Sequence, residues 1–478
     1  IDVLRLLWPN GVVQTQINLD LTDQSIIDDP DAAFGDYTQK TGLIGSCPFL
    51  YTHNGETFEF ISDVLGITPL GLPMAPGMLV PPDHDEFVYV SGDQLKEKDG
   101  ELVMQFTEEL REVTYLDRAK LIAVDHPEGT EIHPNERFTF PPFPEHHTHT
   151  TRAPLAPTRA VASDGRDWAA ELKEIDLIHA APMLREQHQF RGMAQPWFID
   201  LEFDPETVAG AERLRLFMTG WLNWSNASAN MAAAYHPRVQ FLPPLVQVPD
   251  GKGGWRDTGP PVGFPAGKSK TMVLDVTDIL VREDPRVRLF CTLQLYWDRI
   301  VLATDADDAP MVQTTIEPSS AFLWERGFSA PLNEEGGSTP EDFDWDRVAL
   351  FGRWDQHPGQ YTRFGDCLEL LGEIDDRFII MGTGDCLTLT FPASELPELK
   401  DGWRRDWLVF LDGWAKDRDP NSIQALEVEP LPFHGMSGYP YREDEAFPDD
   451  KLHRAWREEW NTREARDWVP NLTVNNSL

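Results

Sequence analysis

The segment CLTLTFPASELPELKDGWRRDWLVFLDGW, residues 386–414, decides the fold of this chain. Its first half alternates apolar and polar residues, which is the pattern of a half-buried β-strand. A short acidic connection follows, and then an arginine-led apolar run that closes on Trp414. The connection is long for a tight hairpin, so we expect its two strands to lie in different sheets of a β-sandwich.

The same pattern occurs twice more, in FIDLEFDPETVAGAERLRLFMTGW (198–221) and TMVLDVTDILVREDPRVRLFCTLQLYW (271–297). We interpret the three segments as a structural repeat, and a coincidence of strand composition is the alternative. Short alternating runs, broken by 34 Gly and 39 Pro, predict a mainly β protein. The expected architecture is several jelly-roll-like β-sandwich units with long loops and a few short helices.

Two segments favour a helix. Residues 449–468, near the C-terminus, place Leu452, Trp456 and Trp460 on one face at intervals of four. Residues 164–178 carry aspartates suited to cap a second short helix. Both helices are expected to pack on sheets.

Turn-rich and polar stretches divide the chain. The expected parts are the strand pair 1–20 around an Asn10–Gly11 turn, a linker 21–46, a β domain 47–165 with a long Pro- and His-rich loop, a β-sandwich domain 166–335, and a β domain 336–478 with the C-terminal helix. The first residue, Ile1, falls within a strand pattern, which indicates a longer precursor.

The charge balance limits the partners. The 478 residues include 80 Asp and Glu against 41 Lys and Arg, a net charge of −39. Nucleic acid needs a basic surface and an anionic membrane repels an acidic one, so neither is an expected partner. No apolar run approaches the ~18 residues of a membrane-spanning helix, so no transmembrane segment is expected.

Four cysteines occur, and none forms a CxxC pair. Cys367 and Cys386 flank a segment that is typical of two strands joined by a turn. Two interpretations stay open: a Cys367–Cys386 disulfide formed in an oxidising compartment, or buried free thiols that act as small hydrophobic residues.

The segment PFPEHHTHTTR (142–152) contains His146, His147 and His149. In an extended chain His147 and His149 face one way and His146 the other. Strong zinc motifs instead hold their ligands at fixed spacing on a rigid element. We therefore predict a surface loop that contacts a neighbouring domain or subunit and binds no metal.

Alternating aspartates suggest Ca²⁺ as the one cofactor worth testing. Asp305, Asp307 and Asp308 lie in DADDAP, although this segment lacks the glycine and the glutamate of an EF-hand loop. A solvated turn is the alternative.

Two loops that follow Gly-Trp combine aromatic rings with amides and carboxylates, which is the combination that sugar binding uses. The alternative is that the Trp residues lie in the core and the Asn and Asp residues form turns. The candidate ligand-binding residues are Trp221, Asn223, Trp224 and Asn226 in the first loop, and Trp414, Asp417 and Asn421 in the second.

Several segments resemble a known family. LRLLWPNGVVQT is similar to the closing strands of the ASPIC/UnbV domain, with its Trp-Pro-x-Gly core at Trp8 to Gly11. SCPFLYTHNGETFEFISDVLGITPLGL, TGWLNWSNASANMA and RRDWLVFLDGWAKDRDPNS resemble the region that follows this domain in secreted bacterial FG-GAP proteins similar to cartilage acidic protein 1. The resemblance makes residues 1–20 the tail of an ASPIC/UnbV-like domain. It also implies an upstream FG-GAP propeller with Ca²⁺ loops, and export from the cytoplasm.

Two classes of function remain open. The first is a non-enzymatic extracellular or cell-surface module for adhesion, carbohydrate contact or assembly, whose partners are the propeller of the same precursor, other subunits or glycans. The second is a secreted hydrolase that uses a carboxylate pair or a metal. The sequence contains no recognisable nucleophile or metal motif, and this favours the first class.

Overall fold

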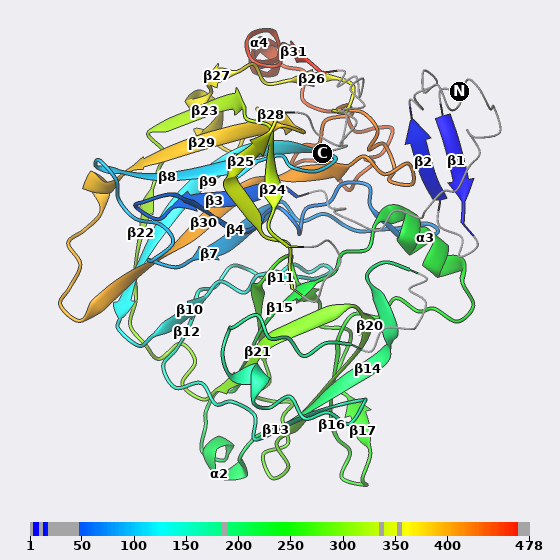
Figure 1. Cartoon of the computed structure of the whole chain (residues 1–478), viewed down its shortest axis with the longest axis vertical. Helices are drawn as coiled ribbons and strands as arrows, with labels where there is room; N and C mark the ends of the chain where they lie inside the picture. Colours follow the sequence, from blue (N-terminus) through cyan, green and yellow to red (C-terminus); the bar gives the residue numbers. More distant parts are fainter. Residues whose placement is uncertain are drawn as a thin grey trace, which may run out of the picture.

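The computed structural model describes residues 3–8, 13–17, 47–182, 190–333, 339–350 and 356–466. These residues form a mainly β structure with few helices, as predicted. Every pair of named strands is antiparallel, and the strands build two β-sandwiches that lie one above the other in Figure 1. The predicted linker 21–46 and the Asn10–Gly11 turn lie outside the described residues.

Sandwich 1 is the upper one. Its first sheet has the order β27 (Gly365–Asp366), β23 (Ser320–Glu325), β29 (Asp385–Pro392), β8 (Glu101–Thr107), β3 (Phe49–His53) and β4 (Phe58–Asp63). Its second sheet has the order β22 (Val312–Ile316), β9 (Glu112–Pro127), β30 (Trp403–Asp417) and β7 (Asp85–Val90), and β28 (Ile379–Gly382) also pairs with β9. One hydrophobic core, with side chains from both sheets, joins them.

Sandwich 2 is the lower one. Its sheets are β13 (Arg159–Ala162), β14 (Met193–Glu202), β20 (Arg286–Leu293), β16 (Leu245–Pro249) and β17 (Trp255–Asp257), facing β19 (Lys270–Asp275), β15 (Arg215–Leu222) and β21 (Leu295–Ala303). A second hydrophobic core fills the space between them.

Short pairs and helices complete the structure. The two-stranded pairs are β1 (Val3–Leu7) with β2 (Val13–Ile17), β5 (Pro73–Ala75) with β6 (Met78–Leu79), β10 (Glu131–His133) with β12 (His149–Thr151), β11 (Arg137–Phe138) with β18 (Phe264–Pro265), β24 (Phe328–Pro331) with β25 (Phe343–Ala349), and β26 (Gln360–Tyr361) with β31 (Arg463–Glu464). The helices are α2 (Pro205–Val208), α3 (Ala227–Tyr235) and α4 (Lys451–Glu459), with 3₁₀ turns η2 (Glu171–Lys173), η3 (Leu368–Leu371) and η4 (Ala393–Glu395).

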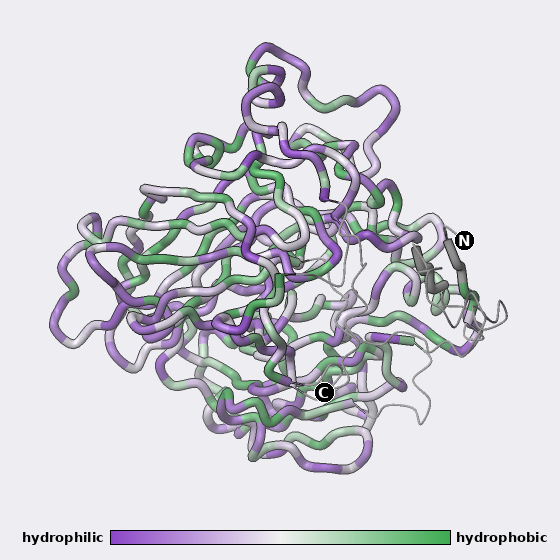
Figure 2. The backbone as a smooth tube through the Cα atoms, turned by 45° about the horizontal axis from the view of Figure 1, so that its top comes forward, coloured by the Kyte–Doolittle hydropathy of each residue, from purple (hydrophilic) through white to green (hydrophobic). Residues whose placement is uncertain are grey.

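The three sequence repeats place their strands as predicted. In each repeat the two strands belong to opposite sheets of one sandwich: β29 and β30, β14 and β15, and β19 and β20. Short hydrophilic and hydrophobic stretches alternate along the backbone (Figure 2). In β7 every second residue is buried. The central strands β9 and β30 are instead buried almost throughout, because other strands and the opposing sheet enclose them.

The division into domains differs from the prediction. Strands of the predicted domains 47–165 and 336–478 share both sheets of sandwich 1, and β22 and β23, from within 166–335, join them. Sandwich 2 is thus inserted into sandwich 1 between β9 and β22, as the colours of Figure 1 show. Pairing between strands almost 300 residues apart leaves no trace in local sequence pattern.

Two local predictions are corrected. Residues 164–178 form turns and η2 rather than a longer helix, because the Asp167 carboxylate accepts the backbone N–H groups of Ala160 and Ala169 and ties the segment to β13. A C-terminal helix is confirmed as α4, capped by Asp450, with Trp456 and Trp460 buried and Leu452 exposed. It is shorter than the expected 449–468, because the chain leaves the helix after Glu459 and pairs as β31 with β26.

The predicted Cys367–Cys386 disulfide is absent, and all four cysteines are buried free thiols. Cys367 follows β27, Cys386 lies on β29, and β23 runs between these two strands. Strands that are next-but-one lie about 9–10 Å apart, beyond the ~7 Å between Cα atoms that a disulfide can bridge.

Candidate metal centre

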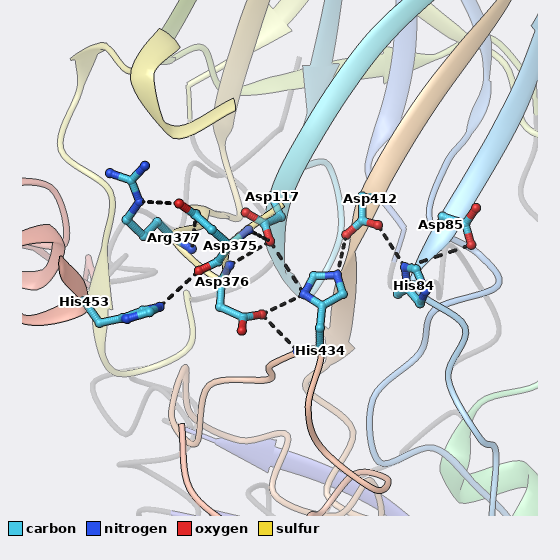
Figure 3. Close-up of polar contacts among 9 residues, drawn as sticks. All are labelled: His84, Asp85, Asp117, Asp375, Asp376, Arg377, Asp412, His434 and His453. Atoms are coloured by element: carbon cyan, nitrogen blue, oxygen red, sulfur yellow. Dashed lines mark hydrogen bonds and ion pairs between the residues drawn. The ribbon is translucent and has the colours of Figure 1, made fainter. Parts of the chain in front are cut away.

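Five polar side chains from separate segments meet beside strands β7, β9 and β30 (Figure 3). His84 precedes β7, Asp117 lies on β9 and Asp412 on β30. Asp376 lies in the turn before β28, and His434 in the long segment after β30. We call this group the metal centre.

A β-bulge brings the two strand aspartates together. Asp412 pairs with Arg118 whereas the next residue, Gly413, pairs with Leu116, so Asp117 is an extra residue in β9. Bulges turn side chains away from the regular alternation and are frequent next to functional sites. Both aspartates lie close to His434 in consequence.

Asp412 bridges the two histidines. Its Oδ2 lies 2.8 Å from Nδ1 of His84 and its Oδ1 lies 2.8 Å from Nε2 of His434. Burial alone would raise the pKa of Asp412, but the hydrogen bonds from His434 and His84 lower it.

His434 is held from its other nitrogen as well. Its Nδ1 lies 2.7 Å from Oδ1 of Asp376 and 3.7 Å from Oδ2 of Asp117. Burial lowers the pKa of His434, but the hydrogen bonds to Asp376 and Asp412 outweigh it and raise that pKa to about 10. Asp117 in turn accepts the backbone N–H groups of Asp375 and Asp376, which fixes the turn that carries Asp376.

The C-terminal helix supports the same turn. His453 of α4 lies with its Nε2 3.0 Å from the carbonyl oxygen of Asp375, and the Asp375 carboxylate accepts Nε of Arg377 at 2.8 Å (Figure 3). Packing of α4 on the sandwich thereby contributes to the position of Asp376.

The centre is closed on one side and open on the other. Below it, the ring of Trp414 lies 4.7 Å from the ring of His434 and is buried. The side chain of His84 is 49% exposed, and Oδ1 of Asp85 lies 4.0 Å from its Nδ1. Burial raises the pKa of the adjacent Asp83 to about 6.

The arrangement provides donors suited to a metal ion. One ligand atom each from His84, Asp412 and His434 can be chosen so that all lie within 4.8 Å of one another. Two imidazoles and a carboxylate form the facial set that binds divalent first-row metals while leaving positions open. Donors about 2.1 Å from a tetrahedral ion lie about 3.4 Å apart, so binding would lengthen the 2.8 Å distances that now join each histidine to a separate oxygen of Asp412.

Of the candidate ligand-binding residues predicted from the sequence, only Trp414 contacts the metal centre. Its ring is buried and packs against His434. Trp221 is also buried and stacks on Tyr296 with 4.5 Å between ring centroids. Asn226 caps α3 by accepting the N–H of Ala229. Trp221, Asn223 and Trp224 do line a common cavity between the sandwiches, but its space of about 10 Å³ is that of a single water molecule.

The two aromatic loops meet through hydrogen bonds of their own. Nδ2 of Asn421 donates to Oγ of Ser228 at 2.7 Å, and the same hydroxyl donates to Asp419. Asn421 and Asn226 therefore hold the ends of the two loops in place.

Asp417 belongs to a buried acidic group in sandwich 1. It forms an ion pair with Arg111 at 3.3 Å and lies opposite Glu112 in the strand register. Glu108 is fully buried nearby, beside the side chains of Glu112 and Thr114. Burial, assisted by neighbouring carboxylates, raises the pKa of Glu108 from 4.5 to about 7 and raises that of Glu112 too.

This acidic group should make stability depend on pH. A carboxyl whose folded-state pKa is raised stabilises the fold below its unfolded pKa, and the stabilisation is lost as the pH rises through about 7. We expect wild type to lose on the order of 3 kcal/mol more than Glu108→Gln between pH 5 and pH 8. Melting temperatures at both pH values check this, with the exposed Glu101→Gln as control. An equal change in melting temperature between pH 5 and pH 8 for wild type and Glu108→Gln would contradict the raised pKa of Glu108.

The predicted Ca²⁺ ligands are already occupied by protein groups. Asp305 accepts Oγ1 of Thr151 and the N–H groups of Arg152 and Ala153. Arg215 forms an ion pair with Asp307, and Arg213 with Asp308. Arginine side chains supply the positive charge here, so this segment does not favour Ca²⁺.

The histidine-rich segment has the predicted alternation, but only part of it is a surface loop. His146 and His147 are exposed, whereas His149 is buried on β12 because it pairs with β10. His146 stacks on Phe87 of β7 with 3.4 Å between ring centroids, and both residues belong to the predicted domain 47–165. Contact of this segment with a neighbouring domain or subunit therefore stays a prediction. His147 and His149 lie on the other side, near Asp307. Nη1 of Arg215 lies 3.1 Å from Nδ1 of His149, and this cation would repel a metal ion. That the segment binds no metal stays a prediction.

Sequence reasoning missed His84, Asp117, Asp376, Asp412 and His434. Their spacing carries no motif, because each comes from a different segment. One signal was present: Asp117 and Asp412 interrupt the apolar runs TYLDRAKL and LVFLDGW, and a carboxylate inside a buried strand needs a partner.

Within the described ranges, no helix is long and apolar enough to cross a membrane. Comparison with known proteins adds no relative: no family model, no curated protein and no solved structure matches the chain.

Proposed function

We propose that this chain is a metal-dependent hydrolase of the extracytoplasmic space, in which His84, Asp412 and His434 bind one divalent first-row metal ion. The observation that carries the proposal is the Asp412 carboxylate, held 2.8 Å from one nitrogen of each histidine. Zn²⁺ is the expected ion, because hydrolytic sites with two histidines and one carboxylate use it.

The surroundings of His434 support this assignment. Histidine ligands commonly donate their second N–H to a carboxylate, which fixes the tautomer and orients the ring. Asp376 occupies that position, 2.7 Å from Nδ1, and leaves Nε2 for the ion. The turn that carries Asp376 is itself held by Asp117 and α4.

Access from solvent favours catalysis over a purely structural ion. Structural zinc sites are closed by four protein ligands, whereas catalytic sites keep a position for water. Here three ligands come from the chain and His84 is half exposed. A bound ion would polarise a substrate carbonyl and lower the pKa of its water. Asp85, with Oδ1 4.0 Å from His84, is placed to accept a proton.

A second candidate is the non-enzymatic module attached to a propeller. The shared position of Trp221, Asn223 and Trp224 around one small cavity favours it, because aromatic rings and an amide suit a sugar. Glycan binding that survives metal removal and is lost in Trp224→Ala would favour this role instead.

The proposal is tested by metal binding. Protein freed of metal with a chelator should take up about one equivalent of Zn²⁺ in equilibrium dialysis, and Co²⁺ should give visible absorption bands of a histidine–carboxylate site. A panel of ester, amide and phosphoester substrates should show turnover that chelation abolishes and Zn²⁺ restores. Absence of stoichiometric binding at micromolar Zn²⁺ would refute the metal centre, and binding without turnover would refute the hydrolase.

A further inference from the structure

A partly open cavity with about 60 Å³ of space for small molecules lies directly beside the metal centre. Asp83, Asp85 and Phe87 line it from the β7 side, and Arg137, Glu145 and His146 line it from the segment that leads to sandwich 2. Because Asp85 reaches to 4.0 Å from Nδ1 of His84, a molecule in this cavity would lie next to the metal ligands.

Arg137 is the unusual residue of this cavity. Its guanidinium forms no hydrogen bond or ion pair within the described residues, and its Nε is buried. Burial lowers its pKa, with no neighbouring carboxylate to oppose that effect.

Several part-buried arginines of this acidic chain pair with a carboxylate. Arg288 binds Asp200, Arg405 binds Asp125 and Arg299 binds Glu131, each through two hydrogen bonds. Arg137 by contrast forms no ion pair with a described residue, although Asp83, Asp85 and Glu145 line the same cavity.

The adjacent Glu136 does not fill this role, because other groups hold it. Its carboxylate accepts the backbone N–H groups of Tyr89 and Thr271, and Nζ of Lys270 lies 3.6 Å away. The two terminal nitrogens of Arg137, rather than its buried Nε, therefore remain available to a ligand.

We propose that this cavity binds a monocarboxylate group of the substrate, with Arg137 as its anchor. Guanidinium and carboxylate match in a two-bond, fork-to-fork geometry. A phosphate dianion fits less well, since Asp83, Asp85 and Glu145 line the same cavity and repel a second negative charge. The stacked rings of Phe87 and His146 give a flat wall for an apolar or aromatic group beside the carboxylate. This inference rests on the proposed metal-dependent function for its link to catalysis.

The test uses benzoate and inorganic phosphate as probes of the full chain, with and without Zn²⁺. Calorimetry should show that benzoate binds wild type more tightly than phosphate does. In Arg137→Gln benzoate should bind at least about tenfold more weakly, and Arg137→Lys should be intermediate because it keeps the charge without the fork. Arg256→Gln, at an exposed arginine of β17, should bind like wild type.

Zinc content and melting temperature are measured on the same samples. Equal benzoate affinity of wild type and Arg137→Gln, no benzoate binding, or tighter phosphate binding would each overturn the inference. If wild type binds no zinc, the proposed metal-dependent function is refuted. Benzoate binding that depends on Arg137 would in that case still support a carboxylate site in the cavity.

Discussion

Replacing Asp412 by asparagine should weaken Zn²⁺ binding by more than about 100-fold, since loss of an outer partner of a ligand alone costs about 10- to 100-fold. The carboxylate lies between both histidine ligands and supplies the one negative charge of the set. An amide keeps the shape but lacks the charge, and only its oxygen can coordinate. Competition with a chromophoric chelator measures the affinity.

Matched variants distinguish a residue that binds the metal ion from a residue that only orients a metal ligand. Asp376→Asn should weaken Zn²⁺ binding by about 10- to 100-fold, because it alters only the group that orients His434. Asp401→Asn, at an exposed turn before β30, should leave it unchanged. Equal affinities of Asp412→Asn and wild type, with the fold verified by melting temperature, would show that Asp412 is not a ligand.

The architecture was largely predictable because it depends on local periodicity. The alternation in 386–414 and its two counterparts predicted strands in opposite sheets, and all three segments are arranged in this way. The C-terminal helix followed from Trp456 and Trp460, which are both buried.

Long-range pairing was not predictable in the same way. β29 pairs with β8, and β30 with β7 and β9, across about 280 to 320 residues of sequence. Any alternating strand can in principle occupy such a position, so the sequence of one strand does not identify its neighbour. This is why one sandwich formed from two distant segments was expected to be two domains.

The metal centre depends on that pairing. His84 and His434 are single histidines in irregular segments, and only the contact of β7, β9 and β30 brings them to Asp412. The histidine-rich segment offered a stronger local signal, yet in the structure Arg215 lies against His149 and Asp307. Histidine density in the sequence was therefore a poor guide to ligand geometry.

Replacing Gly413 by alanine should destabilise the fold by more than about 3 kcal/mol and weaken Zn²⁺ binding as well. Gly413 has φ +153°, and a Cβ built on it would clash with the backbone carbonyl oxygen of Tyr115. That carbonyl belongs to β9 and cannot turn aside without breaking the ladder between β9 and β30.

Gly402→Ala is the matched control. Gly402 also has positive φ, at +70°, but a Cβ there would meet no atom within 4 Å. The substitution Gly402→Ala should therefore lower the free energy of unfolding by only about 1 kcal/mol, which is the penalty of the backbone conformation alone. The melting temperature and the denaturant midpoint measure the stability of both variants. Similar losses of stability in Gly413→Ala and Gly402→Ala would show that the close approach of β9 and β30 does not require a glycine. A selective loss in Gly413→Ala would mean that the bulge holds Asp412 and Asp117 at His434, so that the strained backbone is part of the metal centre.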